Sequence, residues 1–230
     1  MPNTSLVARP RVAFTLAAVA GWVDAVGFLI LFGLFTAHLS GNTARLGVTV
    51  GHGDFSQALT YAVPIVVFFA AVVVGISYIR SRADRQPRAL GGVLAAEAAL
   101  LVAFMVVGTV LRDAGDLTPH SLAYYGLAVA AVGAMGLQTA ALRHAAGVPV
   151  HTTFVTGMVT SFAEEVAGVL QHRGPDCARR ARVHGGLVGA YLLGAVGGAA
   201  LESAWALWAL TVPLAALAVL IVTVGGKPAV

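Results

Sequence analysis

The chain has 230 residues, of which 58% are hydrophobic and 10% charged, with a mean hydropathy of +0.86. A soluble domain of this length would be about a quarter charged, and it could not stay dissolved with several apolar runs of roughly 20 residues, so a water-soluble fold is excluded. The net charge of +4 comes from arginines in short loops between apolar runs. This excess predicts membrane topology and gives no support for nucleic-acid binding.

Six segments are long and apolar enough to cross a bilayer, which predicts an all-α membrane protein with one integral domain over residues 1–230. In chain order they are residues 13–35, 56–79, 89–111, 121–142, 184–201 and 204–224. The first follows two arginines as a signal peptide would, but it is longer than a signal peptide core and contains Asp24, so we expect it to be retained. The intervals 36–54 and 151–172 mix polar and apolar residues and are expected to be re-entrant or interfacial.

Clusters of basic residues fix the expected orientation. The basic residues lie at four sites: Arg9 with Arg11, residues 80–88, residues 173–182, and Lys227. Six crossings place all four sites in the cytoplasm together with both termini, as the positive-inside rule favours. An alternative with eight crossings would put residues 80–88 outside. Six crossings divide into two three-helix halves, about residues 12–112 and 120–225, and an odd number per half makes the repeat inverted.

A polar motif recurs at the same place in both halves, after the first span. Thr36-Ala37-His38-Leu39-Ser40-Gly41-Asn42-Thr43 is matched by Thr152-Thr153-Phe154-Val155-Thr156-Gly157-Met158-Val159. A helix that restarts at Ser40-Gly41 and at Thr156-Gly157 would expose unpaired N–H groups, which the Ser or Thr hydroxyl can cap and an anion can bind. The candidate substrate-binding residues are Ser40, Gly41, Asn42, Thr43, Thr152, Thr156 and Gly157. In the alternative interpretation, these residues merely cap helices that are bent at glycine.

Polar side chains inside the spans are candidates for coupling or selectivity. They are Asp24, His38, Glu97 and Gln138. A carboxyl group facing lipid costs several kcal/mol, so Asp24 and Glu97 should face the bundle. Asp24 is expected to find a partner or a watery cavity, with a structural interhelical cap as the alternative. Glu97 suits either a proton-coupled step or a neutral acid that makes one structural hydrogen bond.

Small residues form stripes on two spans. Gly186, Ala190, Gly194 and Gly198 lie on one face of the fifth, and Gly126, Ala130 and Ala134 on one face of the fourth. We expect close packing within the bundle, while a homodimer through one such face is the alternative.

Motifs for catalysis and for metal or cofactor binding are absent from the sequence. There is no H-E-x-x-H, G-x-S-x-G or Walker pattern, and Cys177 is the single cysteine. We therefore expect no enzyme activity, no metal and no cofactor.

The motifs resemble those of the YoaK-like family of small bacterial multipass membrane proteins of unknown function. The resemblance rests on Gly21 to Phe28, Phe35 to Thr43, Gly136 to Ala141 and Thr152 to Gly157, and it covers residues 12–223. It implies a bacterial inner-membrane protein and no particular activity.

From the residues we expect a small-molecule or ion transporter or channel, with its site between the two motifs. The cargo would be a small anion or a carboxylate metabolite, as the helix starts and Arg45 suggest, or a proton or cation, as Asp24 suggests. A non-transporting scaffold or sensor subunit is the alternative, and an intramembrane hydrolase is a third.

Overall fold

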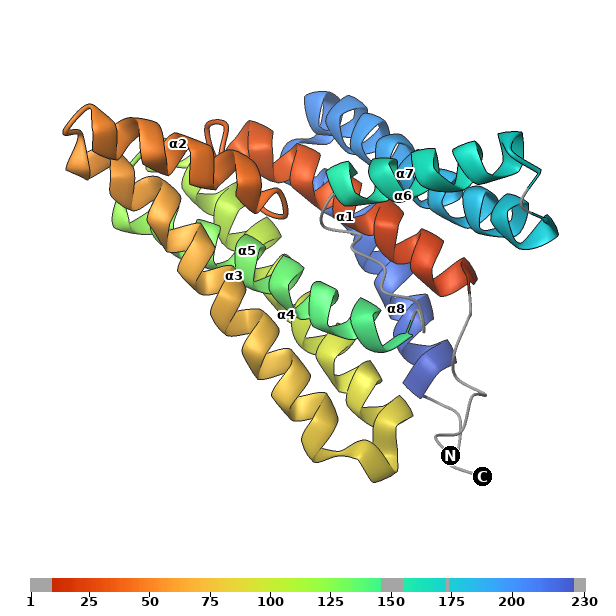
Figure 1. The fold of residues 1–230 in the computed structure, drawn as a ribbon. Helices are drawn as coiled ribbons and strands as arrows, with labels where there is room; N and C mark the ends of the chain where they lie inside the picture. The colour runs from red at the N-terminus through yellow and green to blue at the C-terminus, as the bar shows by residue number, and fades with distance from the viewer. Residues whose placement is uncertain (1–9, 146–154, 173, 226–230) are drawn as a thin grey trace.

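The computed structural model describes residues 10–145, 155–172 and 174–225, and every regular element in those ranges is a helix (Figure 1). In order they are α1 (Pro10–Ile30), α2 (Leu39–Gly51), α3 (Phe55–Ser81), η2 (Ala83–Arg85), α4 (Gln86–Asp113), α5 (Leu122–Ala145), α6 (Val155–Leu170), α7 (Pro175–Trp205), η3 (Ala206–Leu210) and α8 (Thr211–Gly225). The elements labelled η are short 3-10 helices. The predicted all-helical class is confirmed.

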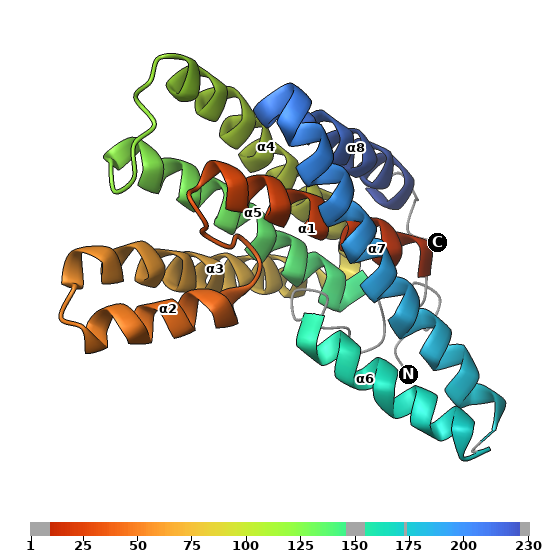
Figure 2. The same cartoon turned by 90° about the horizontal axis from the view of Figure 1, so that it is seen from above.

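Five helical stretches among the described residues are long and apolar enough to cross a membrane. They are Arg11–Ile30, Phe55–Ser81, Ala83–Asp113, Leu122–Arg143 and Pro175–Val224. The fifth has 50 residues and contains α7, η3 and α8. Both views show α8 running back from the end of α7, and Ala206 at this turn has a φ of +50° (Figures 1 and 2). The fifth and sixth predicted spans therefore lie in one helical stretch that reverses at η3.

The polar intervals after α1 and α5 each contain a short helix. The 13 residues of α2 and the 16 of α6 extend about 20–24 Å, which is less than the ~30 Å of hydrocarbon in a bilayer. α1 ends at Ile30, before the predicted limit of residue 35, because Phe32 and Gly33 adopt positive φ values of 53° and 87°. The loop after them leads back to α2.

The helices pack in two corresponding sets (Figure 2). α1 packs along α7, with α6 beside α7, while α3 packs along α5, with α2 beside α3. α4 packs against both α5 and α8. Glycine makes the α1–α7 contact close: a Cβ on Gly21 would lie 2.0 Å from the Tyr191 carbonyl oxygen, and one on Gly194 2.0 Å from that of Ala18. The expected use of the α7 stripe in packing within the bundle is confirmed.

Candidate functional site

Asp24 lies within α1, and its side chain is only 3% exposed. The loop between α1 and α2 folds back over it, so that the backbone N–H groups of Thr36 and Ala37 donate to Oδ1 at 2.7 and 2.9 Å. The Thr36 hydroxyl donates to the same oxygen at 3.0 Å. A carboxylate oxygen that accepts three donors is satisfied without water. Asp24 thus fixes the loop that leads into α2, and the expectation that it finds a partner inside the bundle is confirmed.

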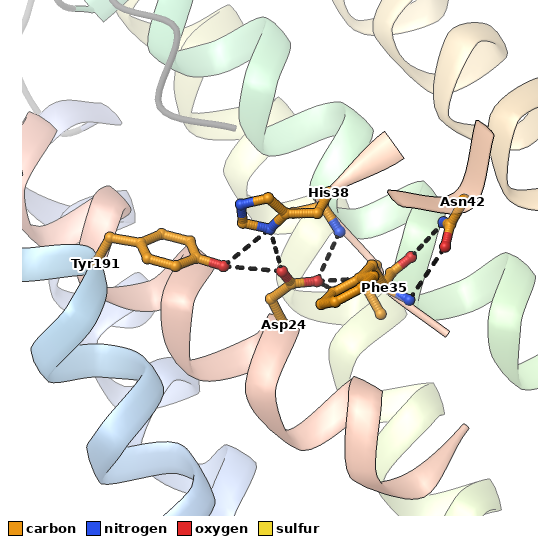
Figure 3. Close-up of polar contacts among 7 residues, drawn as sticks. Asp24, Phe35, His38, Asn42 and Tyr191 are labelled. Carbon is orange, nitrogen blue, oxygen red and sulfur yellow. Dashed lines mark hydrogen bonds and ion pairs between the residues drawn. The ribbon is translucent and has the colours of Figure 1, made fainter. Parts of the chain in front are cut away.

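His38 and Tyr191 bind the other carboxylate oxygen (Figure 3). His38 Nδ1 lies 2.5 Å from Oδ2 of Asp24, and the Tyr191 hydroxyl, from α7, donates to Oδ2 at 2.8 Å. The same hydroxyl lies 3.1 Å from His38 Nδ1. The His38 side chain is 23% exposed and Tyr191 is also partly exposed, whereas Asp24 is buried, so water can reach His38 and Tyr191 but not the carboxylate. We refer to Asp24, Thr36, Ala37, His38 and Tyr191 as the Asp24 centre.

The Asp24 centre pairs a carboxylate with an imidazole at a break between two helices. When His38 is protonated the pair is neutral overall, and when it is not the carboxylate depends on hydrogen-bond donors alone. Such a pair can hold or release a proton, or can offer negative charge to a cation. Asp24 is buried, so any proton exchange between its carboxylate and water would pass through His38 or Tyr191.

The first motif continues from this centre into α2. Asn42 is fully buried and bonds the backbone of Phe35 in both directions, with Nδ2 donating to its carbonyl at 2.8 Å and Oδ1 accepting from its N–H at 3.4 Å (Figure 3). Gly41 lies under the Phe35 ring, where a Cβ would be 3.1 Å away. Thr43 donates to the Leu39 carbonyl of its own helix. Asn42 and Gly41 therefore hold the loop that carries His38.

The predicted cap at Ser40 is wrong. α2 begins at Leu39, its N-cap residue is His38, and no side chain caps it by a hydrogen bond. Ser40 lies within the first turn and is exposed. The reason is that Ser40 is the second residue of α2, so its hydroxyl lies past the N-cap position from which a side chain accepts the first free N–H groups.

Arg45, expected as a fixed positive charge near the motif, holds the same loop from its other side. Its Nη1 donates to the Gly33 carbonyl at 2.6 Å, and its guanidinium lies 5.7 Å from the centre of the Tyr61 ring. No hydrogen bond or ion pair joins it to the Asp24 centre in the described structure. The charged group of Arg45 therefore contacts the loop and the Tyr61 ring of α3.

The second motif leads into α6. Thr156 and Gly157 lie in the first turn of this helix, Thr156 is exposed, and its carbonyl accepts the Thr160 hydroxyl at 2.9 Å. Thr152 lies outside the described residues. Both views place the first turns of α2 and α6 toward one another near the middle of the molecule (Figures 1 and 2). The two motifs thus approach one another at their helix starts.

Glu97 and Gln138 do not join the Asp24 centre. Glu97 is fully buried on α4, and neither of its carboxyl oxygens has a hydrogen-bond partner. Gln138 on α5 donates through Nε2 to the Leu16 carbonyl of α1 at 2.6 Å, while its Oε1 is buried without a partner. Among the candidate coupling residues, the structure therefore brings together Asp24 and His38 and leaves Glu97 and Gln138 in another part of the core.

Sequence reasoning missed the partner supplied by α7. Tyr191 is the single tyrosine of α7, 167 positions from Asp24, and nothing in its local sequence separates it from a lipid-facing tyrosine. Thr36 did have a signal, since it begins the repeated motif. Within the described residues, no three His, Cys, Asp or Glu side chains lie close enough to hold a metal ion.

Comparison with known proteins places the chain among membrane proteins. Residues 12–223 match the family described as "Protein of unknown function (DUF1275)". A relative is the UPF0700 transmembrane protein YoaK of Bacillus subtilis (strain 168), which is 25% identical over 168 residues, or 73% of this chain and 71% of the relative. No solved structure matches. The apolar helices and the relative's name agree on a multipass membrane protein. The resemblance expected from the motifs is confirmed, and the chain belongs to the DUF1275 family of proteins of unknown function.

Proposed function

We propose that this protein is a small-molecule or ion transporter or channel of the bacterial inner membrane, with its site at the Asp24 centre and the facing starts of α2 and α6. One observation carries the proposal: a carboxylate and an imidazole are paired at a helix break inside an apolar bundle. Ionisable groups in such a position are costly, and in membrane proteins they commonly mark pathways for substrates or protons. Interrupted helices that meet near the middle of a bundle are where secondary transporters build their sites.

Helix packing supports an inverted repeat of two three-helix halves. If α1 corresponds to α5 and α3 to α7, then the α1–α7 contact corresponds to the α5–α3 contact, and the pair α2–α3 to the pair α6–α7. Each half contributes one short helix after its first long one. In this proposal α7 and α8 are separate crossings, which gives six in all with both termini in the cytoplasm.

Accessibility labelling tests this topology. Cys177 would first be replaced by Ser, and single cysteines introduced as Arg85→Cys, Arg180→Cys and Asp116→Cys. We expect a membrane-impermeant maleimide added to intact cells to label the cysteine at 116 and to reach those at 85 and 180 only after permeabilisation. Labelling of positions 85 and 180 from opposite sides would exclude the inverted repeat.

The contacts of Asp24 and Arg45 bear on the charge of the solute that the Asp24 centre would bind. The Asp24 carboxylate occupies the N–H groups just before α2, so this helix start is already neutralised by the protein itself. Arg45 is engaged by the Gly33 carbonyl. Both observations favour a cation, or a solute carried with a proton, over a free anion at the Asp24 centre. The start of α6, with Thr156 and Gly157, is the place where an anion or a carboxylate group of a solute would bind.

A ligand screen on the purified protein tests the site. Thermal unfolding would be followed with alkali cations, inorganic anions, short-chain carboxylates and amino acids, each compared between the natural chain, Asp24→Asn, and the double variant Ser40→Ala with Thr156→Ala. A compound that binds the folded state raises the midpoint, because it adds a stabilisation that grows with the logarithm of 1 + [L]/Kd. We expect at least one compound to stabilise the natural chain more than either variant, and then to be taken up by liposomes containing the protein.

Equal responses of all three proteins to every compound would contradict a site at these residues. The variants are chosen to be informative if they fold, because Asn is isosteric with Asp, and both Ser40 and Thr156 are exposed.

A scaffold or sensor subunit is the second candidate, and one observation favours it. Gly126 of the α5 stripe is exposed, and a Cβ built on it has nothing within 4 Å. This face is open to a partner helix in the membrane, including one from a second copy. Gly126→Leu would weaken such an association in a cross-linking assay and leave solute uptake unchanged.

An enzyme is not part of our proposal. Asp24 and His38 form an acid–base pair, but no hydrogen bond joins His38 to the hydroxyl of Ser40 in the described structure. The hydroxyl within hydrogen-bond reach of the imidazole is that of Tyr191 at 3.1 Å, and it donates to Asp24.

A further inference from the structure

We propose that Glu97 and Gln138 form a proton-binding site between α4 and α5, separate from the Asp24 centre. Three side-chain oxygens are concerned, both of the Glu97 carboxyl and Oε1 of Gln138, and none has a hydrogen-bond partner in the described structure. The two side chains are 0% and 1% exposed. Buried polar atoms are nearly always paired, so an unpaired carboxyl and an unpaired amide oxygen at one interface call for an explanation.

The helix register brings the two side chains to the same level. Gly108 of α4 packs on Leu127 of α5, where a Cβ on Gly108 would lie 3.6 Å from Leu127 Cδ1. Glu97 precedes Gly108 by eleven residues, and Gln138 follows Leu127 by eleven residues. Eleven residues make about three helical turns, so each polar side chain shares the face of its contact residue. Since α4 and α5 are antiparallel (Figure 1), the same displacement places Glu97 and Gln138 at one height along the contact between the two helices.

The neighbours of Glu97 on α4 are apolar, and the Gln138 amide on α5 is held in one orientation. On α4 the neighbours one turn away on the same face are Leu94 and Leu101, and both are fully buried. On α5 the Gln138 amide is oriented by its donation to the Leu16 carbonyl, which leaves Oε1 free to accept. Nε2 keeps a second N–H, but neither Glu97 oxygen has a hydrogen-bond partner in the described structure, so this N–H does not reach the carboxyl. A proton on the Glu97 carboxyl would satisfy both residues, because it gives Gln138 Oε1 a donor and gives Glu97 an acceptor.

Within the described residues, no ion pair joins Glu97 to a cation. Among the elements that pack on α4, η3 and α8 carry no ionisable side chain. The ionisable residues of α3 and α5 lie toward the helix ends, and they are Tyr61, Tyr78, Arg80, Tyr124, Tyr125, Arg143 and His144. The short helix η2 carries Asp84 and Arg85, next to the first residue of α4. A carboxylate in such surroundings would cost many kcal/mol, and the group takes up a proton instead. The neutral acid can then donate its hydrogen to Oε1 of Gln138.

The location suits an exchangeable proton rather than a fixed one. Glu97 lies near the middle of the 28-residue helix α4, so the proton is held deep in the bilayer. Release to water leaves a carboxylate, which is tolerated only when the α4–α5 contact opens to solvent. If the proposed transport function holds, on which this step rests, the proton at Glu97 is the coupled ion, while the Asp24 centre binds the cargo.

Infrared spectroscopy of the full-length protein in lipid bilayers tests this site without any cargo. A protonated carboxylic acid absorbs as a C=O stretching band well above the carboxylate bands. We expect such a band at neutral pH in the natural chain, its loss in Glu97→Gln, and a shift to lower frequency when H₂O is replaced by D₂O. Gln138→Leu should move the band to higher frequency, because it removes the acceptor. Glu165→Gln, at an exposed ion pair, is the control and should leave the band unchanged.

Each other outcome overturns the proposal. A band that is identical in the natural chain and Glu97→Gln means that Glu97 is not the protonated group. A band that persists without a shift in D₂O means that the proton is structural and sealed. If Glu97→Gln fails to fold, Glu97→Asp replaces it, and the band must then change frequency rather than remain. The measurement is independent of the ligand screen, so failure of one leaves the other proposal standing.

Discussion

The α1–α7 and α3–α5 contacts are built alike in their backbones. In the first, a Cβ on Gly21 would lie 2.0 Å from the Tyr191 carbonyl oxygen, and in the second, a Cβ on Gly136 would lie 2.9 Å from that of Phe68. The sequences around the two glycines are Gly21-Trp22-Val23-Asp24-Ala25 and Gly136-Leu137-Gln138-Thr139-Ala140. Both contacts need a residue without a side chain, because the helix backbones touch.

The side chains at the two contacts differ in chemistry. Asp24 in one corresponds to Thr139 in the other, and Tyr191, which donates to Asp24, corresponds to Phe68, which has no hydroxyl. The Thr139 hydroxyl donates to the Met135 carbonyl of its own helix. Close packing is thus common to both halves, whereas the ionisable pair is confined to one. Close helix packing in this fold therefore does not require an ionisable pair at the contact.

The largest effect is expected from removing the carboxylate. Asp24→Ala should destabilise the protein by about 3–5 kcal/mol, because it strands buried donors and leaves His38 unpaired, whereas Thr139→Val should cost at most about 1 kcal/mol. Unfolding by a denaturing detergent, followed by tryptophan fluorescence, measures both. Similar losses at the two positions would mean that the two contacts are not chemically different.

The glycines come next. Gly21→Ala should cost roughly 3 kcal/mol, since its Cβ would meet backbone, and Gly136→Ala roughly 1–2 kcal/mol. Gly126→Ala, which meets nothing within 4 Å, should be neutral or stabilising by up to about 1 kcal/mol through helix propensity. The same unfolding assay ranks the three variants. A larger loss for Gly136→Ala than for Gly21→Ala would reverse our ordering of the two contacts.

A smaller effect is expected from the hydroxyl that joins α7 to the Asp24 centre. Tyr191→Phe makes this position match Phe68 and should cost about 1.5 kcal/mol, the usual value for a hydrogen bond to a charged group. Tyr61→Phe is the matched control, because no hydrogen bond of the Tyr61 hydroxyl is found in the described structure. Equal midpoints for Tyr191→Phe and the natural chain would show that the hydroxyl does not stabilise the centre.

The smallest effect concerns the two short helix pairs. Arg180 donates to Glu165 at 2.6 Å between α6 and α7, and this hydrogen bond lowers the pKa of the Glu165 carboxyl. A lowered pKa stabilises the folded state above the unfolded pKa, and this stabilisation is lost as the pH falls through the folded value. The thermal midpoints of Glu165→Gln and the natural chain should therefore differ slightly at neutral pH and converge in acid.

In the pair α2–α3, Asp54 caps α3 instead, so Asp54→Ala should reduce the midpoint without involving an ion pair.

Much of the fold follows from local composition. Apolar runs of bilayer length predict helices, and the polar interval after the first span predicts a break, which the structure places between Ile30 and Leu39. The predicted spans put the reversal between α7 and α8 at residues 201–204, and in the structure it lies a few residues later, at Ala206. The first residue of α2 could not be predicted correctly, because the loop before it is fixed by Asp24 of α1, which accepts from the N–H groups of Thr36 and Ala37.

Taken by itself, the chain determines that it lies in a membrane, that its elements are helices, and that Asp24 and Glu97 must face inward, because the cost of exposing charge to lipid depends only on residue type and span. Tertiary structure alone decided that Asp24 has His38 and Tyr191 as partners, while Glu97 is paired with no cation among the residues that the structure describes. Those pairings depend on the rotation and register of helices distant in the chain, which are set by where glycines let two backbones meet.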